Sequence, residues 1–129
     1  MNSVVIARGR ECIFDDIKSA SNFWHRLKGL LGTDSLGLKY SGNNDLESSQ
    51  GLLISPCSQI HTFGMRYKID VVFISRALKV INIVAGLGPN HVVRNSASYY
   101  VLELPAGGAE RVNLRNSDQL YICFEGRQR

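Results

Sequence analysis

Two runs of β-branched residues at the centre of the chain constrain its fold more than any other feature. Residues 70–75 read DVVFIS and residues 78–84 read LKVINIV, with the connecting turn at residues 75–77. Val and Ile pack well on a pleated sheet, and a link this short joins neighbouring antiparallel strands. The sequence therefore predicts a β-hairpin over residues 70–84.

Further strand-like runs lie on both sides of this hairpin. We expect strands over residues 3–7, 11–17, 51–54, 98–104 and 119–124. Pro105 ends the fourth of these, because proline has no amide donor for the next ladder bond. Residues 106–111 form a turn or a single helical turn. The short links between most of these runs favour antiparallel pairing.

The clearest helix signal covers residues 19–31. Apolar residues recur there at helical spacing, and they are Ala20, Phe23, Trp24, Leu27, Leu30 and Leu31. Gly32 can end this helix in a left-handed conformation. The polar residues 32–50 form a flap or contain a short turn near residues 36–38. We therefore expect an α+β fold that is mostly antiparallel β, a twisted sheet or partial barrel with one covering helix near residues 19–31.

Length and composition set the class of protein. A chain of 129 residues fits one domain over residues 1–129, and its hydrophobic fraction of 44% is that of a globular chain. No stretch approaches the ~20 apolar residues of a membrane span, and the first residues lack a signal-peptide core. The cysteines Cys12, Cys57 and Cys123 form no close pair, which favours reduced thiols. These features predict a cytoplasmic protein without a membrane partner.

The positive charge gathers in the middle of the chain. The formal net charge is +4, and residues 51–100 carry five basic residues against the single acid Asp70. The five basic residues are Arg66, Lys68, Arg76, Lys79 and Arg94. They are either solvated side chains or a field that attracts a small anion. The surplus is modest beside the basic patches of nucleic-acid-binding proteins, so we do not expect nucleic acid as a partner.

Three motifs carry a family resemblance. They are RLKGLLG at residues 26–32, IHTFGMRYKIDVVF at residues 60–73 and LELPAG at residues 102–107. In this order and spacing, from about residue 19 to residue 122, the chain resembles the prokaryotic family called domain of unknown function 192. The resemblance implies a β-rich fold with a helix and no established activity. The chain departs from the family pattern at Lys68, where proline is usual, and at Asn113 and Ser117, where glycine is usual.

The long middle motif also supplies most of the candidate site residues. Our candidates for ligand binding are His61, Thr62, Met65, Arg66, Asp70 and Glu103. Arg66 suits an anion because a guanidinium binds a carboxylate or phosphate with paired hydrogen bonds. His61 is either pocket lining or a core histidine. Asp70 and Glu103 either meet, so that one acts as an acid, or separately accept hydrogen bonds that hold the fold.

Metal and cofactor sites find less support in the sequence. Cys57 and His61 lie four residues apart, but a zinc site would need further ligands from His25, His91, Asp70 or Cys123. The Gly86–Gly88 pair is too short for a phosphate-binding loop. We therefore expect neither a metal nor a cofactor.

These residues lead to two hypotheses of function. The first is a non-enzymatic ligand-binding or accessory module with a polar groove near His61–Asp70, for a small anionic ligand or a protein partner. The alternative is a small hydrolase or transferase that uses His61 with Cys57, Asp70 or Glu103. The sequence leaves open which of the two is correct.

Overall fold

The computed structural model describes residues 2–20 and 50–124, and most of these lie in β-strands. The elements are β1 (Asn2–Arg8), β2 (Glu11–Ala20), β3 (Gly51–Ile54), β4 (Gln59–His61), β5 (Ile69–Ile74), β6 (Val80–Leu87), β7 (Val92–Arg94), β8 (Tyr100–Pro105), α3 (Gly108–Arg111) and β9 (Leu120–Phe124). Seven strands form one sheet in the order β6-β5-β8-β3-β2-β1-β9, and β4 pairs with β7 in a separate ribbon. No helix in the described part is long and apolar enough to cross a membrane.

The large sheet is mixed rather than wholly antiparallel. Five of its six strand pairs are antiparallel, including the predicted β5–β6 hairpin, but β2 and β3 run parallel with Ile17 opposite Gly51 and Ala20 opposite Ile54. A parallel pair needs a long crossover connection, and residues 21–49 supply the required length. The expectation of mostly antiparallel pairing is thus confirmed, with one exception that the long connection makes possible.

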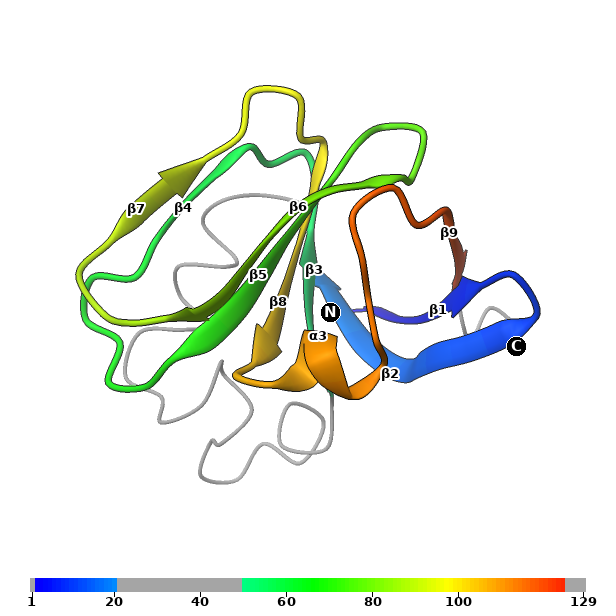
Figure 1. The fold of residues 1–129 in the computed structure, drawn as a ribbon, viewed down its shortest axis with the longest axis horizontal. Coiled ribbons are helices and arrows are strands. Elements are labelled where there is room, and N and C mark those ends of the chain that lie inside the picture. The colour runs from blue at the N-terminus through cyan, green and yellow to red at the C-terminus, as the bar shows by residue number, and fades with distance from the viewer. Residues whose placement is uncertain (1, 21–49, 125–129) are drawn as a thin grey trace.

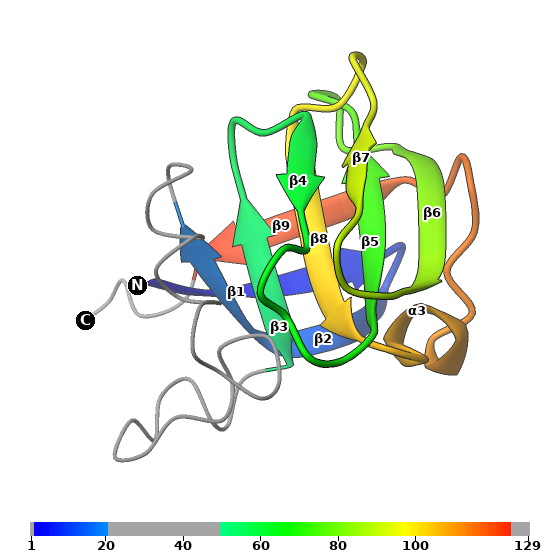
Figure 2. The same ribbon diagram turned by 90° about the vertical axis from the view of Figure 1, so that its left-hand side faces the viewer.

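The sheet curls until its two edges approach each other. Lys79, beside β6, forms a bridge with Gln119, beside β9. The amide of Val80 donates to the carbonyl of Asp118 (2.9 Å), and the amide of Ser117 donates to the carbonyl of Val80 (2.7 Å). The result is a half-barrel, as Figures 1 and 2 show, with α3 near the lower ends of β5 and β8. This agrees with the predicted twisted sheet or partial barrel.

Both faces of the central strands are buried. The concave face holds the main core, which includes Ile6, Phe14, Ile17, Val72, Leu102 and Leu104. A second cluster lies between the other face and the β4–β7 ribbon, and it contains Ile60, Met65, Ile69, Val71, Phe73, Leu87 and Val101. All six residues of β5 are buried as a consequence. Burial on both faces explains why this strand reads as a continuous apolar run instead of an alternating one.

The predicted covering helix falls largely outside the described residues. Its first two positions, Ser19 and Ala20, belong to the end of β2, so a helix does not begin at residue 19. The rest of that helix and almost all of the predicted flap over residues 32–50 lie outside the described part. The described portion is therefore mostly β, with α3 as its one short helix.

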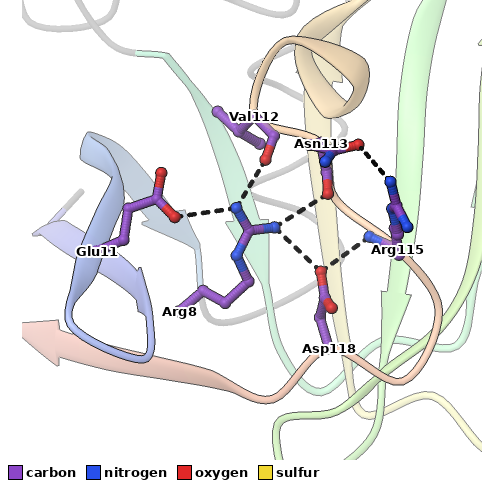
Figure 3. Close-up of polar contacts among 6 residues, drawn as sticks. All are labelled: Arg8, Glu11, Val112, Asn113, Arg115 and Asp118. Atoms are coloured by element: carbon purple, nitrogen blue, oxygen red, sulfur yellow. Dashed lines mark hydrogen bonds and ion pairs between the residues drawn. The ribbon is translucent and has the colours of Figure 1, made fainter.

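Arg8 ties the β1–β2 turn to the loop that precedes β9 (Figure 3). Its guanidinium donates to the carbonyl oxygens of Val112 (2.9 Å) and Asn113 (3.1 Å), and it pairs with Glu11 and Asp118 at 3.1 Å each. Glu11, followed by Asp118, raises the pKa of Arg8 above its ordinary value. Because the connected segments are more than 100 residues apart in the chain, this side chain closes the same side of the half-barrel as the 79–119 bridge.

Replacing Arg8 with methionine should lower the free energy of unfolding by about 2 kcal/mol. Methionine keeps part of the packing volume but loses charge-assisted bonds to two carboxylates and two carbonyls. Urea denaturation measures the difference. Arg10→Met is the matched control: Arg10 is exposed in the same turn, and its replacement should stay within about 0.5 kcal/mol. Equal losses in both variants would contradict the role given to Arg8.

Candidate functional site

The structure divides the six predicted site residues into two groups. His61 is half-buried and Arg66 is exposed. The other four are buried, namely Thr62, Met65, Asp70 and Glu103. Met65 lies in the second hydrophobic cluster, beneath the β4–β7 ribbon. The groove expected near His61–Asp70 is therefore not lined by all of these residues.

Thr62 holds the turn that leads into β7. Its side chain is fully buried, and its hydroxyl donates to the carbonyl of Gly88 (2.8 Å) and accepts from the amide of His91 (2.8 Å). Its own amide donates to the carbonyl of His91 (2.9 Å), and its carbonyl accepts from Asn90 (3.1 Å). These bonds occupy the polar groups of Thr62 within the protein, so the residue positions residues 88–91 beside β4.

Asp70 is a buried structural anchor. The residue is 1% exposed, and its Oδ1 accepts a hydrogen bond from the amide of Gly86 (2.9 Å). Its Oδ2 accepts from the amides of Gly107 and Ala109, both at 3.1 Å. One carboxylate thus joins β5 to the irregular end of β6 and to the start of α3. Of the two roles that the sequence leaves open, these contacts support the one in which Asp70 holds the fold.

Asp70 and Glu103 do not form a carboxylate pair. In the β5–β8 ladder, Asp70 lies opposite Leu104 and Val71 lies opposite Glu103. Opposed residues share a face in an antiparallel pair, and neighbours along a strand point to opposite faces. Asp70 therefore lies on the face of the main core, while Glu103 is fully buried on the face that carries Val71 and Val101. The sheet itself separates the two carboxylates.

Cys57 and His61 each make contact with Gln59. The thiol of Cys57 donates to the backbone carbonyl of Gln59 (3.2 Å). The side-chain amide nitrogen of Gln59 lies 2.9 Å from Nε2 of His61. Both of these bonds run to Gln59, so they do not themselves support a nucleophile–base pair. In the described part of the chain, no three His, Cys, Asp or Glu residues gather as metal ligands would.

A small outward surface lies on the β4–β7 ribbon, at one end of the predicted region. We call it the ribbon face, and it consists of Gln59, His61, Phe63, Val92 and Arg94. Gln59 lies opposite Arg94, His61 lies opposite Val92, and the intervening Ile60 and Val93 point inward to the second cluster. Phe63 and Val92 are 53% and 50% exposed. The Phe63 ring lies beside the His61 ring, with centroids 5.8 Å apart.

The exposed charged side chains of residues 51–100 are all positive. Each of the five basic residues, Arg66, Lys68, Arg76, Lys79 and Arg94, is exposed. The one acid in this stretch, Asp70, is buried against three amides. The surplus seen in the sequence is thus a surface property, and Arg94 brings it onto the ribbon face.

In the sequence, Arg94 is distinguished only as one of the five basic residues of residues 51–100. Its place beside Gln59 and His61 depends on a pairing between segments more than 30 residues apart. The signal available was the alternation in Val92–Val93–Arg94 after Pro89 and Asn90, which marks a short strand after a turn. A strand of three residues has too few alternating positions to indicate which strand it pairs with.

Two solved structures share this fold. A protein of unknown function from Novosphingobium aromaticivorans DSM 12444 matches with a TM-score of 0.67 and 17% sequence identity, over 92% of this chain and 83% of that chain. A protein from Sinorhizobium meliloti 1021, described as a "putative transcription regulator", matches with a TM-score of 0.67 and 18% identity, over 93% of this chain and 92% of that chain. Identities this low establish a common fold alone. No curated protein matches this sequence.

The family model supplies the assignment that the motifs predict. The model of DUF192, whose description is "Uncharacterized ACR", matches residues 4–122. The match begins at β1 and ends within β9, so it spans the half-barrel as well as the ribbon. This range confirms the predicted family and reaches further toward the N-terminus than the predicted residues 19–122. The chain therefore belongs to the DUF192 family.

Proposed function

We propose that this chain is a non-enzymatic binding module that holds a small anionic ligand with an apolar group on the ribbon face. The observation that carries the proposal is the arrangement on β4 and β7. An exposed guanidinium, that of Arg94, lies on the same ribbon face as the rings of His61 and Phe63. No exposed acid from residues 51–100 competes for that guanidinium.

The charged part of the ligand is matched by Arg94. A guanidinium presents a planar fork that fits a carboxylate or a phosphate with two parallel hydrogen bonds. In the described structure, no carboxylate forms an ion pair with Arg94. An incoming anion would therefore not have to displace an internal partner from these residues.

The apolar part of the ligand is matched by Phe63 and Val92. Each is about half exposed, and together they flank His61 on the ribbon face. Large exposed apolar side chains beside polar groups are typical of binding surfaces. Because Ile60 and Val93 fix the ribbon to the core, the outward side chains sit on an ordered support.

The enzyme hypothesis draws less support from the same region. It needs His61 to act with Cys57, Asp70 or Glu103. The described side-chain contacts of Cys57 and His61 run to Gln59. The carboxylate of Asp70 lies on the main-core face of β5, opposite to the face that the ribbon covers, and it binds backbone amides there. We therefore place binding, and not bond cleavage, at the ribbon face.

Titration with benzoate and phenyl phosphate, followed by amide chemical shifts, tests this function. We expect shifts at residues 59–63 and 92–94 with both anions and much weaker shifts with uncharged benzyl alcohol. Arg94→Gln should weaken the binding of both anions about tenfold, which corresponds to the loss of a charge-assisted bond.

Lys79→Gln is the matched control for this titration. It removes an exposed charge at the β5–β6 turn, away from the ribbon face, and should leave the affinity unchanged. Shifts that gather elsewhere, or an affinity that Arg94→Gln does not alter, would show that the ribbon face is not the binding site.

A further inference from the structure

Arg76, in the turn between β5 and β6, presents a second guanidinium that is held in place. Its guanidinium carbon lies 4.6 Å from the centroid of the Tyr99 ring. The Tyr99 ring meets the Tyr100 ring edge to face, with centroids 4.9 Å apart, and Tyr100 packs against the main core. A guanidinium stacked on a ring keeps its N–H donors in its own plane, where they can reach an anion. Arg76 is therefore an ordered cation, although the residue is exposed.

Backbone hydrogen bonds place this stack beside the end of the ribbon that carries Arg94. The amide of Asn95, the residue after Arg94, donates to the carbonyl of Ser58 (2.9 Å). The amide of the preceding residue, Cys57, donates to the carbonyl of Tyr99 (2.9 Å). Figure 2 shows the same arrangement, because β5 and β7 end, and β8 begins, at the upper end of the molecule. The segment just before β4 thus links the Arg94 end of the ribbon to the stack.

A tight turn sets the distance between the two cationic positions. The amide of Ser98 donates to the carbonyl of Asn95 (2.9 Å), which closes a four-residue turn. The first and last Cα atoms of such a turn lie within about 7 Å of each other. With one step of about 3.8 Å on either side, the Cα atoms of Arg94 and Tyr99 are at most about 15 Å apart. An extended peptide covers about 3.3–3.6 Å per residue, so residues three positions apart reach both guanidinium groups.

The charges along this path favour a ligand with two negative groups. Among the described residues, no carboxylate forms an ion pair with Arg76 or Arg94. Ser96 and Ala97, at the tip of the turn between them, are exposed and uncharged. Asp70, the one acid of residues 51–100, is buried elsewhere against backbone amides. A ligand that runs from Arg94 to Arg76 therefore meets no acidic side chain from residues 51–100.

We propose that the ribbon face and the Arg76–Tyr99 stack together bind an acidic peptide segment of a partner protein. Two acidic side chains three positions apart pair with Arg94 and Arg76, and an apolar residue next to the first one contacts Phe63 and Val92. This inference rests on the proposed function, because the first acidic side chain occupies the anion position at Arg94. It names the class of ligand as a peptide that carries two negative charges at a fixed spacing.

Isothermal titration of the full chain with two peptides tests this proposal. The two-charge peptide is acetyl-Phe-Glu-Gly-Gly-Glu-amide, and the one-charge peptide has glutamine in place of its last glutamate. Each is also made in the reverse order, and the chain direction that binds more tightly is used. We expect the two-charge peptide to bind about fivefold more tightly, as one additional exposed ion pair provides.

Three variants of the protein assign this preference to one guanidinium. Arg76→Gln should abolish the preference and leave the affinity for the one-charge peptide unchanged. Arg94→Gln should weaken the binding of both peptides and keep the preference between them. Lys79→Gln is the matched control, because it removes an exposed charge beside the same hairpin turn, and it should keep the preference.

The outcomes separate this proposal from the proposed function. A preference of less than about twofold in the unmodified chain would overturn the proposal. A preference that survives Arg76→Gln would overturn it as well, and so would one that Lys79→Gln abolishes equally, since the cause would then be a diffuse positive field. If Arg94→Gln still weakens both peptides in these cases, the ribbon face remains a binding site and only its extension to Arg76 fails. If Arg94→Gln weakens neither peptide, both proposals fail.

Discussion

Replacing Asp70 with alanine should lower the free energy of unfolding by about 4 kcal/mol. The carboxylate accepts hydrogen bonds from the amides of Gly86, Gly107 and Ala109, and the residue is 1% exposed. Its removal leaves buried amides without an acceptor, and each such group costs about 1–3 kcal/mol. Because the three amides belong to two segments, the irregular end of β6 and the start of α3 should also loosen. Urea denaturation measures the loss, and amide exchange at residues 86 and 107–109 locates it.

Asp15→Ala is the matched control for Asp70→Ala. Asp15 is an exposed acid in β2, and its replacement should change stability by no more than about 0.5 kcal/mol. The loss of stability in Asp70→Asn should lie between those of Asp70→Ala and Asp15→Ala. The asparagine keeps one carbonyl oxygen as an acceptor but turns an N–H donor toward a backbone amide. The folded form of Asp70→Asn should still bind phenyl phosphate on the ribbon face. A loss of less than about 1 kcal/mol for Asp70→Ala would contradict its role as an anchor.

Asp70 and Thr62 show why local sequence does not distinguish a ligand contact from an internal hydrogen-bonded anchor. Both are polar residues in a motif with aromatic neighbours, and such a pattern is typical of a ligand pocket as well as of a buried hydrogen-bonded turn. The two cases differ in the partners, and the partners lie 16 to 39 residues away for Asp70 and 26 to 29 for Thr62. Local sequence carries no information on contacts at that distance. The motif therefore does not separate residues that could bind a ligand from residues that hold the fold.

The elements with a strong local pattern were predicted well. The hairpin over residues 70–84 is β5–β6, and the run at residues 51–54 is β3. These predictions depend only on apolar runs of β-branched and aliphatic residues. The predicted helix lies almost wholly outside the described residues, so the described structure tests only its first two positions.

Long-range pairing was the part that sequence could not supply. The parallel contact of β2 with β3 joins segments on either side of a long polar stretch, and the β4–β7 ribbon pairs two strands of three residues each. In neither pair does the hydrophobic pattern of one strand indicate the strand that it pairs with. The ribbon face, and with it the position of Arg94, follows from that pairing. This explains why a residue counted only as charge becomes the centre of the proposed binding surface.

Replacing Gly51 with alanine should lower the free energy of unfolding by about 3 kcal/mol. A Cβ atom at this position would lie 2.5 Å from the carbonyl oxygen of Glu103 and 2.8 Å from Cδ2 of Leu104. The carbonyl belongs to a strand held between β3 and β5, with Glu103 opposite both Leu52 and Val71, so it cannot withdraw without disturbing two ladders. Inserting a methyl group into such a site costs about 1–3 kcal/mol, and the fixed backbone places this site at the upper end.

Gly51 lies in the parallel β2–β3 pair of the described sheet. The effect of the substitution on this pair can therefore be measured locally, by amide exchange. Gly51 lies opposite Ile17 at the start of the β2–β3 pair, so strain at this residue should weaken amide protection in residues 51–54 before it affects the β1–β9 pair. Gly88→Ala is the matched control: nothing lies within 4 Å of its added Cβ, and stability should stay within about 0.5 kcal/mol. Equal stability of the two variants would show that β3 can shift away from β8, and that the close approach at Gly51 does not fix the parallel strand in its place.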